Sequence, residues 1–278
     1  MRRNSARSLL CAGGIAVMLV AGVSASHSWG GYHWARQTSQ FTLKLGDNLT
    51  TATWKGHLAQ TSLDWNSGNT PVLTAVVAGQ SRKRCSMVAG TSQVCNDSYG
   101  RNGWLGLASI NIIDGTHITQ GSAKMNDTYF NTSTYNNPNE REHVMCQEVA
   151  HTFGLAHQSE DGSSQNSCMD YFSNTGANAG SSVSTKPNAH DFQELNIIYQ
   201  HLDTTTTVAA MAAMTASRVD AGDNEDAKNW GQLVSQSRNG RSSTYERFEQ
   251  DGSQTLTHVY WTLEAAETCR GCDHRFDH

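Results

Sequence analysis

The spacing of hydrophobic and polar residues predicts strands and helices over the first two hundred positions. Alternation or β-branched runs typical of strands occupy residues 41–45, 72–78, 103–113 and 117–125, and residues 72–78 are expected to be buried. Apolar residues at helical spacing predict helices over 54–65 and 187–202. Residues 80–100 are polar and contain glycine, so an irregular excursion is expected there. The pattern predicts a sheet backed by helices.

The pattern changes after position 202. A threonine run, an Ala/Met-rich stretch and a group of acidic residues indicate a linker over 203–227. Residues 243–250 and 255–262 then alternate around Asp251-Gly252, which is a strong hairpin signal. We therefore expect a main domain over 26–202 and a C-terminal hairpin extension with a tail over 228–278.

The first 25 residues have the features of a secretory signal peptide. Three arginines precede an apolar run over 9–23, and Val23-Ser24-Ala25 supplies the small residues of a cleavage site. The sequence thus predicts secretion, with no membrane attachment after cleavage. Cleavage removes three positive charges and no negative one, so the formal charge of −5 becomes −8. That balance disfavours nucleic acid as a partner.

Six cysteines remain after the signal peptide, an even number in a chain predicted to be exported. Cys85 with Cys95 would close a short loop, and Cys146 with Cys168 would join two segments of a candidate site described next. The last two, Cys269 and Cys272, precede histidines. They form either a disulfide in a tail or, less in keeping with export, a second zinc site.

Residues 147–157 read Q-E-V-A-H-T-F-G-L-A-H and contain the strongest chemical signal. Glu148 and His151 have the spacing of the H-E-x-x-H helix, in which imidazoles four residues apart bind zinc and the glutamate is a general base. Gly154 and His157 extend the pattern, because a glycine in a left-handed turn ends the helix and brings a further imidazole to the metal. Gln147 occupies the position of the first histidine.

Residues 167–171, S-C-M-D-Y, complete a resemblance to the metzincin clan of zinc metallopeptidases, closest to its astacin and serralysin branches. The resemblance implies an α+β fold with a mixed twisted sheet, an active-site helix and a C-terminal helix. It implies a zinc cofactor bound by His151 and His157, Glu148 as general base, Met169 beneath the metal, and a Tyr171 hydroxyl near the zinc or the oxyanion. It also implies a peptide or protein substrate, which would add as a strand along residues 103–113 or 117–125.

Three outcomes follow from Gln147. The amide oxygen is a third ligand, weaker than imidazole; another residue is the third ligand; or the protein is a weak or inactive relative that binds without catalysis.

His143 lies on the same helical stripe but about 12 Å from His151 along the axis, too far to share one ion. His117 is more simply a hydrogen-bonded histidine. Trp29, Tyr32 and Trp34 are expected to pack as an N-terminal anchor, with a carbohydrate platform as the less common alternative.

Overall fold

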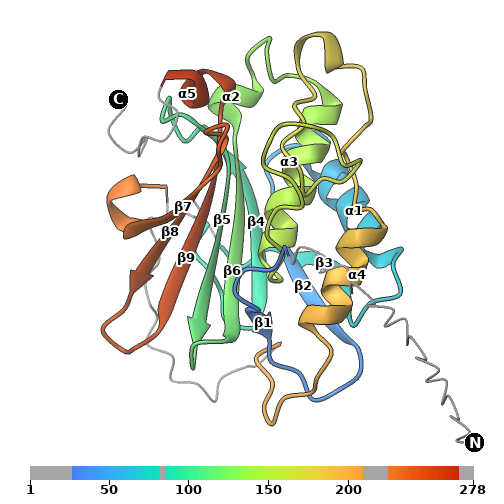
Figure 1. Cartoon of the computed structure of the whole chain (residues 1–278), viewed down its shortest axis with the longest axis vertical. Coiled ribbons are helices and arrows are strands. Elements are labelled where there is room, and N and C mark those ends of the chain that lie inside the picture. The colour runs from blue at the N-terminus through green and yellow to red at the C-terminus, as the bar shows by residue number, and fades with distance from the viewer. Residues whose placement is uncertain (1–26, 82–84, 209–224, 269–278) are drawn as a thin grey trace, which may run out of the picture.

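The structure is a computed structural model that describes residues 27–81, 85–208 and 225–268. These residues form a large mixed sheet with helices grouped beside it, so the predicted α+β class is confirmed (Figure 1). Strands follow the order β3-β2-β4-β6-β5-β9-β8-β7, and the short β1 pairs with β6 outside that path. The predicted signal peptide and the tail cysteines lie outside the described residues. Among those described, no helix is long and apolar enough to cross a bilayer.

One half of the sheet is parallel. Its strands are β2 (Phe41–Asn48), β3 (Val72–Ala78), β4 (Thr91–Asp97) and β6 (His117–Asn126). The prediction that residues 72–78 form a buried strand is wrong in part, because β3 lies at the sheet edge and Val76 is 41% exposed. Val72 and Thr74 are buried, whereas Val76 on the same face of the strand is exposed, so β3 is covered only along its first half.

The polar segment 80–100 is not an irregular excursion throughout, since its second half is β4 in the middle of the sheet. Ser92 and Gln93 are fully buried there. The Gln93 side chain accepts hydrogen bonds from the Asn48 amide (2.9 Å) and the backbone N–H of Gln80 (3.0 Å). Partners of this kind make it possible to bury a polar strand.

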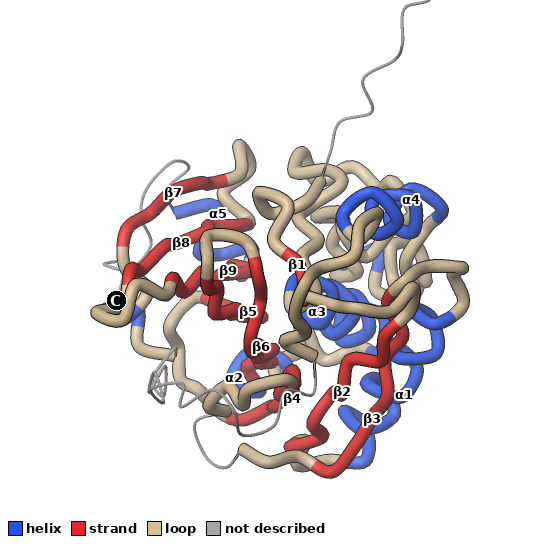
Figure 2. Tube along the Cα trace, turned by 90° about the horizontal axis from the view of Figure 1, so that it is seen from below, coloured by secondary structure: helices blue, strands red, loops and turns tan. Residues whose placement is uncertain are grey.

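The other half of the sheet is antiparallel. It consists of β5 (Trp104–Ile113), β7 (Gln232–Gln236), β8 (Ser242–Phe248) and β9 (Gln254–Trp261). The predicted C-terminal hairpin is confirmed as β8 and β9. Its second strand also pairs with β5, with His258 opposite Ala108. The hairpin is thus hydrogen-bonded into the main sheet, as Figure 2 shows from below.

Three longer helices lie beside the sheet: α1 (Ala52–Asn66), α3 (Pro138–His151) and α4 (Ala189–Ile198). Short helices are α2 (Asp127–Phe130) and α5 (Leu263–Thr268). Thr51 caps α1, which buries Trp54, Leu58 and Trp65 as its apolar spacing predicts. The helix predicted over 187–202 is shorter at both ends: it begins after Asn188, which forms a capping box with Asp191, and ends at Ile198, before the non-helical Tyr199. The central helix, α3, packs against β5, β6 and α1.

The N-terminal aromatic residues form the predicted anchor. Trp29 is 8% exposed and Trp34 is fully buried. Trp34 belongs to β1 (His33–Trp34), and its indole N–H donates to the backbone oxygen of Thr152 at 2.9 Å. The anchor therefore holds the chain just beyond the end of α3, where the candidate site lies.

Candidate metal centre

Helix α3 is built to hold a polar site inside the protein. Asn137 caps its first turn by accepting the backbone N–H of Glu140 at 2.9 Å, and Pro138 occupies a position where its missing N–H has no consequence. Every residue from His143 to His151 is buried. Its polar side chains therefore have to find partners within the protein, and Glu148 and His151 find them in one cluster.

The turn after α3 follows the sequence prediction. Gly154 has a φ of +101°, and a Cβ added there would lie 2.2 Å from the backbone oxygen of Tyr32. Only glycine combines this left-handed conformation with so close an approach. The turn brings His157 back to His151, and their Nε2 atoms lie 3.1 Å apart. The structure thus joins the two histidines that the motif predicted as neighbours.

The outer nitrogens of both rings are hydrogen-bonded to acceptors. His151 Nδ1 lies 2.7 Å from the backbone oxygen of Leu155, and His157 Nδ1 lies 3.0 Å from the Glu160 carboxylate. Each neutral ring therefore carries its proton on Nδ1 and turns a lone pair on Nε2 toward the other ring. This outer-shell arrangement is the one found around metal-binding histidines. Two facing lone pairs are unfavourable unless a cation lies between them.

A third imidazole comes from β9. His258 lies with its ring centroid 4.1 Å from that of His151 and 4.6 Å from that of His157. One ligating atom from each of the three histidines lies within 4.8 Å of the others, close enough to hold one ion. His258 Nδ1 lies 3.3 Å from Glu148 Oε2, so its Nε2 is also left as an acceptor. Sequence reasoning missed this residue, and a single histidine in a distant strand offers no signal by which to find it.

Tyr171 links two of the three rings. Its hydroxyl oxygen lies 2.8 Å from Nε2 of His157 and 2.8 Å from Nε2 of His258. The hydroxyl has one proton, so it can donate to only one of them at a time. Burial lowers the pKa of His157 to about 4 and that of His258 to about 3, which keeps both rings neutral and able to bind a metal at neutral pH.

Glu148 is the buried carboxylate of the cluster. Its side chain is fully buried, and Oε1 has no hydrogen-bond partner. Gly106 on β5 leaves space for it, since a Cβ there would lie 2.5 Å from Oε1. Burial raises the pKa of Glu148 well above its usual range, and the nearby His157 and His143 only partly oppose that shift. A bound cation would oppose it further and favour the charged carboxylate.

The structure holds Gln147 by its amide nitrogen. Nε2 donates to the backbone oxygens of Cys168 (2.8 Å) and Asp170 (2.9 Å), which fixes the orientation of the amide. Its buried Oε1 has no partner, which suits a metal-facing oxygen. The role of Gln147 as a ligand stays a prediction.

His143 has hydrogen-bond partners at both ring nitrogens, namely the Asn174 side chain and the Asp170 backbone oxygen.

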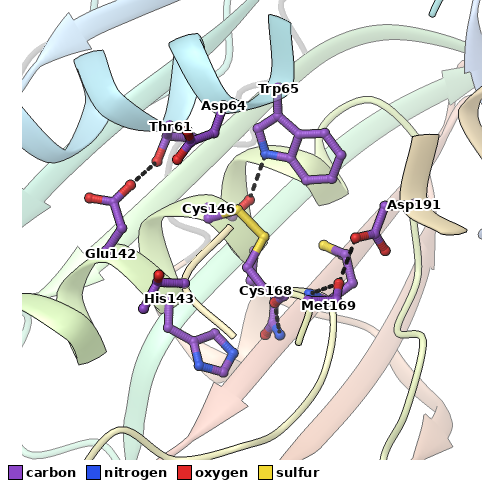
Figure 3. The surroundings of a disulfide bond; sticks show 12 residues. Thr61, Asp64, Trp65, Glu142, His143, Cys146, Cys168, Met169 and Asp191 are labelled. Carbon is purple, nitrogen blue, oxygen red and sulfur yellow. Dashed lines mark hydrogen bonds between the residues drawn. A yellow bond between two sulfur atoms is a disulfide. The ribbon is translucent and has the colours of Figure 1, made fainter. Parts of the chain in front are cut away.

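The turn beneath the cluster is anchored from several sides. The Cys146–Cys168 disulfide ties it to α3, and Trp65 donates to the Cys146 backbone oxygen at 3.3 Å (Figure 3). Ser167 donates to Asp191 at 2.6 Å and accepts the backbone N–H of Met169 at 2.9 Å. Both predicted disulfides, this one and Cys85–Cys95, are confirmed. Met169 lies fully buried in this turn, as expected of a residue beneath the site.

The cluster is enclosed. The side chains of Glu148 and His258 are fully buried, and that of His157 is 4% exposed. Trp29 stacks on His151 with ring centroids 4.7 Å apart and an angle of 5° between the planes.

Both strands expected to offer an edge to a peptide are interior in the described sheet, because β6 lies between β4 and β5, and β5 between β6 and β9. That expectation is wrong for this arrangement, since β9 takes the free side of β5.

No protein-family model matches the chain, and no curated protein matches it. The solved structure of myroilysin matches with a TM-score of 0.34 and 13% identity, over 60% of this chain and 96% of that one. High choriolytic enzyme 1, a hatching-enzyme zinc protease of the medaka fish Oryzias latipes, matches with a TM-score of 0.33 and 10% identity, over 60% and 94%. Likenesses this weak assign neither fold nor activity. The candidate centre stands on its own geometry, in which three buried imidazoles face one another beside a buried carboxylate.

Proposed function

We propose that the chain is a secreted zinc-dependent peptidase whose metal is held by His151, His157 and His258. The observation that carries this proposal is the shared orientation of the three rings. Each Nδ1 atom lies against a carbonyl or carboxylate oxygen, and one ligating atom of each ring meets those of the other two. A donor set of three neutral imidazoles suits zinc and leaves a coordination position for water or substrate, as catalytic zinc sites do.

Zinc in this position would supply a water of lowered pKa and would polarise a carbonyl group. The protein supplies the rest. Glu148, whose Oε1 has no hydrogen-bond partner, accepts the proton of the attacking water and passes it to the leaving amine. The Tyr171 hydroxyl, held between two ligand rings, is placed to donate to the oxyanion of a tetrahedral intermediate. Burial excludes bulk water from these groups.

Peptides or proteins are the proposed substrates, and the outside of the cell is the proposed location. The two disulfides support export, because such bonds form and persist in oxidising compartments. The predicted signal peptide leads to the same location. The net negative charge predicted for the processed chain argues against nucleic acid.

Replacing Glu148 with alanine tests catalysis directly. We expect hydrolysis of casein or gelatin to fall by about 100-fold to 10,000-fold, because the general base is lost while the three imidazoles remain. Zinc content at saturating zinc and the circular dichroism spectrum should be unchanged, whereas zinc affinity should fall by about 10-fold to 100-fold because His258 loses its carboxylate partner. Glu142→Ala on the same helix is the matched control, since Glu142 pairs with His57 outside the centre. Unchanged hydrolysis in Glu148→Ala would exclude the proposed mechanism.

A second candidate is a secreted binding protein on the same scaffold with weak or no activity. The burial of the candidate centre favours a binding protein over an enzyme. In addition, β9 occupies the side of β5 along which a peptide was expected to add. The two candidates differ in one measurement. A wild-type protein that binds zinc and remains inert toward casein, gelatin and a peptide library in excess zinc would support the binding protein and exclude the peptidase.

The contribution of Gln147 is tested by replacement with histidine. If Gln147 Oε1 faces the metal, an imidazole there should tighten zinc binding, because nitrogen is a stronger ligand for zinc than an amide oxygen. Competition with a chromophoric chelator measures the affinity. Gln147→Glu is the comparison of nearly equal size, with a carboxylate in place of the amide. Unchanged affinity in Gln147→His would place Gln147 outside the ligand set.

A further inference from the structure

A second group of histidine and aspartate side chains shares no residue with the candidate centre. It contains His33, His201 and Asp203, whose ligating atoms lie within 4.8 Å of one another. His33 belongs to β1, and the other two follow α4. The register of β1 on β6 places His33 opposite His117.

The atoms of this group converge on one carboxylate oxygen. Asp203 Oδ1 lies 3.5 Å from Nε2 of His33, 3.4 Å from Nε2 of His201 and 3.4 Å from Nε2 of His117. The Nε2 atoms of His33 and His201 are 3.1 Å apart. A tetrahedral zinc ion with bonds of about 2.0 to 2.1 Å sets its ligand atoms about 3.3 to 3.4 Å apart. The spacings among His33, His201 and Asp203 lie within about 0.3 Å of those expected around one zinc ion.

Hydrogen bonds on the outer side of the group orient its members. His33 Nδ1 lies 2.8 Å from the backbone oxygen of Gly31, so Nε2 is the nitrogen of this ring that faces Asp203 and His201. Asp203 Oδ2 accepts the backbone N–H of Arg36 at 2.9 Å, which leaves Oδ1 facing the histidines. A proton on His201 can bridge only one of these contacts, whereas one cation would contact all three ligating atoms.

From these contacts we propose that His33, His201 and Asp203 bind a second zinc ion, with water as the fourth ligand. Imidazole nitrogens with one carboxylate oxygen form a donor set suited to zinc. The side chains of His33 and Asp203 are 3% and 7% exposed, while that of His201 is 49% exposed, so the ion can enter from solvent. The role of this zinc is structural.

The proposed zinc would fasten the N-terminal segment to the segment after α4. These segments already exchange backbone hydrogen bonds, from Asp203 N–H to Arg36 and from Thr207 N–H to Ala35. The neighbouring Tyr199, whose ring lies edge-on to His33, donates its hydroxyl to the backbone oxygen of Phe153 at 3.0 Å. Loss of the ion should therefore loosen the anchor beside the turn that follows α3.

The experiment compares zinc stoichiometry in the full chain, made without a histidine tag, stripped of metal and titrated with zinc alone. His201→Ala is the main variant, because half of that side chain is exposed and its loss should be tolerated. We expect it to bind one equivalent fewer than wild type, or to bind that equivalent at least about 100-fold more weakly. Asp203→Asn, which keeps its size, should show the same loss. His57→Ala should lose nothing, because this histidine pairs with Glu142 and belongs to neither group of metal-binding candidates.

Thermal unfolding supplies a readout that does not depend on activity. Added zinc should raise the melting temperature of wild type more than that of His201→Ala, because a ligand that binds the folded state stabilises it. The difference of one equivalent is measurable whether or not the candidate centre binds zinc, so this test is independent of the proposed peptidase. Equal stoichiometry and equal zinc-induced stabilisation in wild type and His201→Ala would overturn the second site.

Discussion

Replacing His258 with alanine is expected to remove zinc from the candidate centre and to abolish peptide hydrolysis. The variant loses one of the three imidazoles proposed as ligands and, with it, the hydrogen bond to Glu148 Oε2. Loss of outer-shell partners alone lowers metal affinity by about 10-fold to 100-fold, so loss of a direct ligand should lower it by at least about 100-fold. Zinc affinity by chelator competition and hydrolysis of casein measure the two effects.

Two further variants make this result specific. His143→Ala removes another fully buried histidine of the same neighbourhood, one that is hydrogen-bonded to Asn174 and the Asp170 backbone, and should retain zinc. His258→Gln keeps a polar side chain of similar length in the buried strand, and so separates loss of the ligand from a failure to fold. Retained zinc with increased hydrolysis in His258→Ala would contradict the proposed ligand set. It would instead identify His258 as a group that blocks the centre.

The part of the site that could be predicted from the sequence is local. Glu148, His151, Gly154 and His157 lie within ten residues, where helix geometry and one glycine turn fix their relations. The Cys146–Cys168 bridge was predictable because it joins two motifs that a single metal would bring together. Such features depend on the conformation of one short segment and on little else.

The third imidazole was not predictable, because it depends on pairing between distant strands. His258 reaches α3 only because β9 pairs with β5, whose residues lie about 150 positions earlier in the chain. Hydrophobic alternation indicated a hairpin over these residues but not the strand beside which it would lie. The same pairing explains why the expected edge for a peptide is absent: β9 occupies it.

The polar sequence of β4 did not predict a buried strand, again because the burial of β4 depends on segments distant in the sequence. Its sequence, T-S-Q-V-C-N-D, has few of the residues that favour strands, yet six of its seven residues are buried. Asn96 donates to the Thr50 hydroxyl at 2.8 Å and accepts the Thr50 N–H at 2.8 Å. Partners supplied by neighbouring segments decide whether such a strand can be buried, and the strand's own sequence does not contain them.

Replacing Gly154 with alanine is expected to destabilise the protein and to weaken zinc binding together. At a φ of +101° any side chain is strained, and the added Cβ would lie 2.2 Å from the backbone oxygen of Tyr32, which belongs to the N-terminal anchor. Positive φ costs about 1 to 2 kcal/mol, and overpacking against rigid backbone adds about 1 to 3 kcal/mol. We expect the free energy of unfolding to fall by about 2 to 5 kcal/mol.

Gly100→Ala separates the strain of a positive φ from the contact between the added Cβ and the backbone of Tyr32. Its φ of +95° is close to that of Gly154, but a Cβ there would meet nothing within 4 Å, so only the conformational strain remains. We expect a loss of about 1 to 2 kcal/mol and unchanged zinc affinity. Gly154→Ala should bind zinc more weakly, because the turn that it distorts brings His157 to His151. Chemical denaturation and chelator competition measure both quantities. Equal losses in the two variants would mean that the approach of Tyr32 does not constrain this turn, and that the anchor does not hold His157 in place.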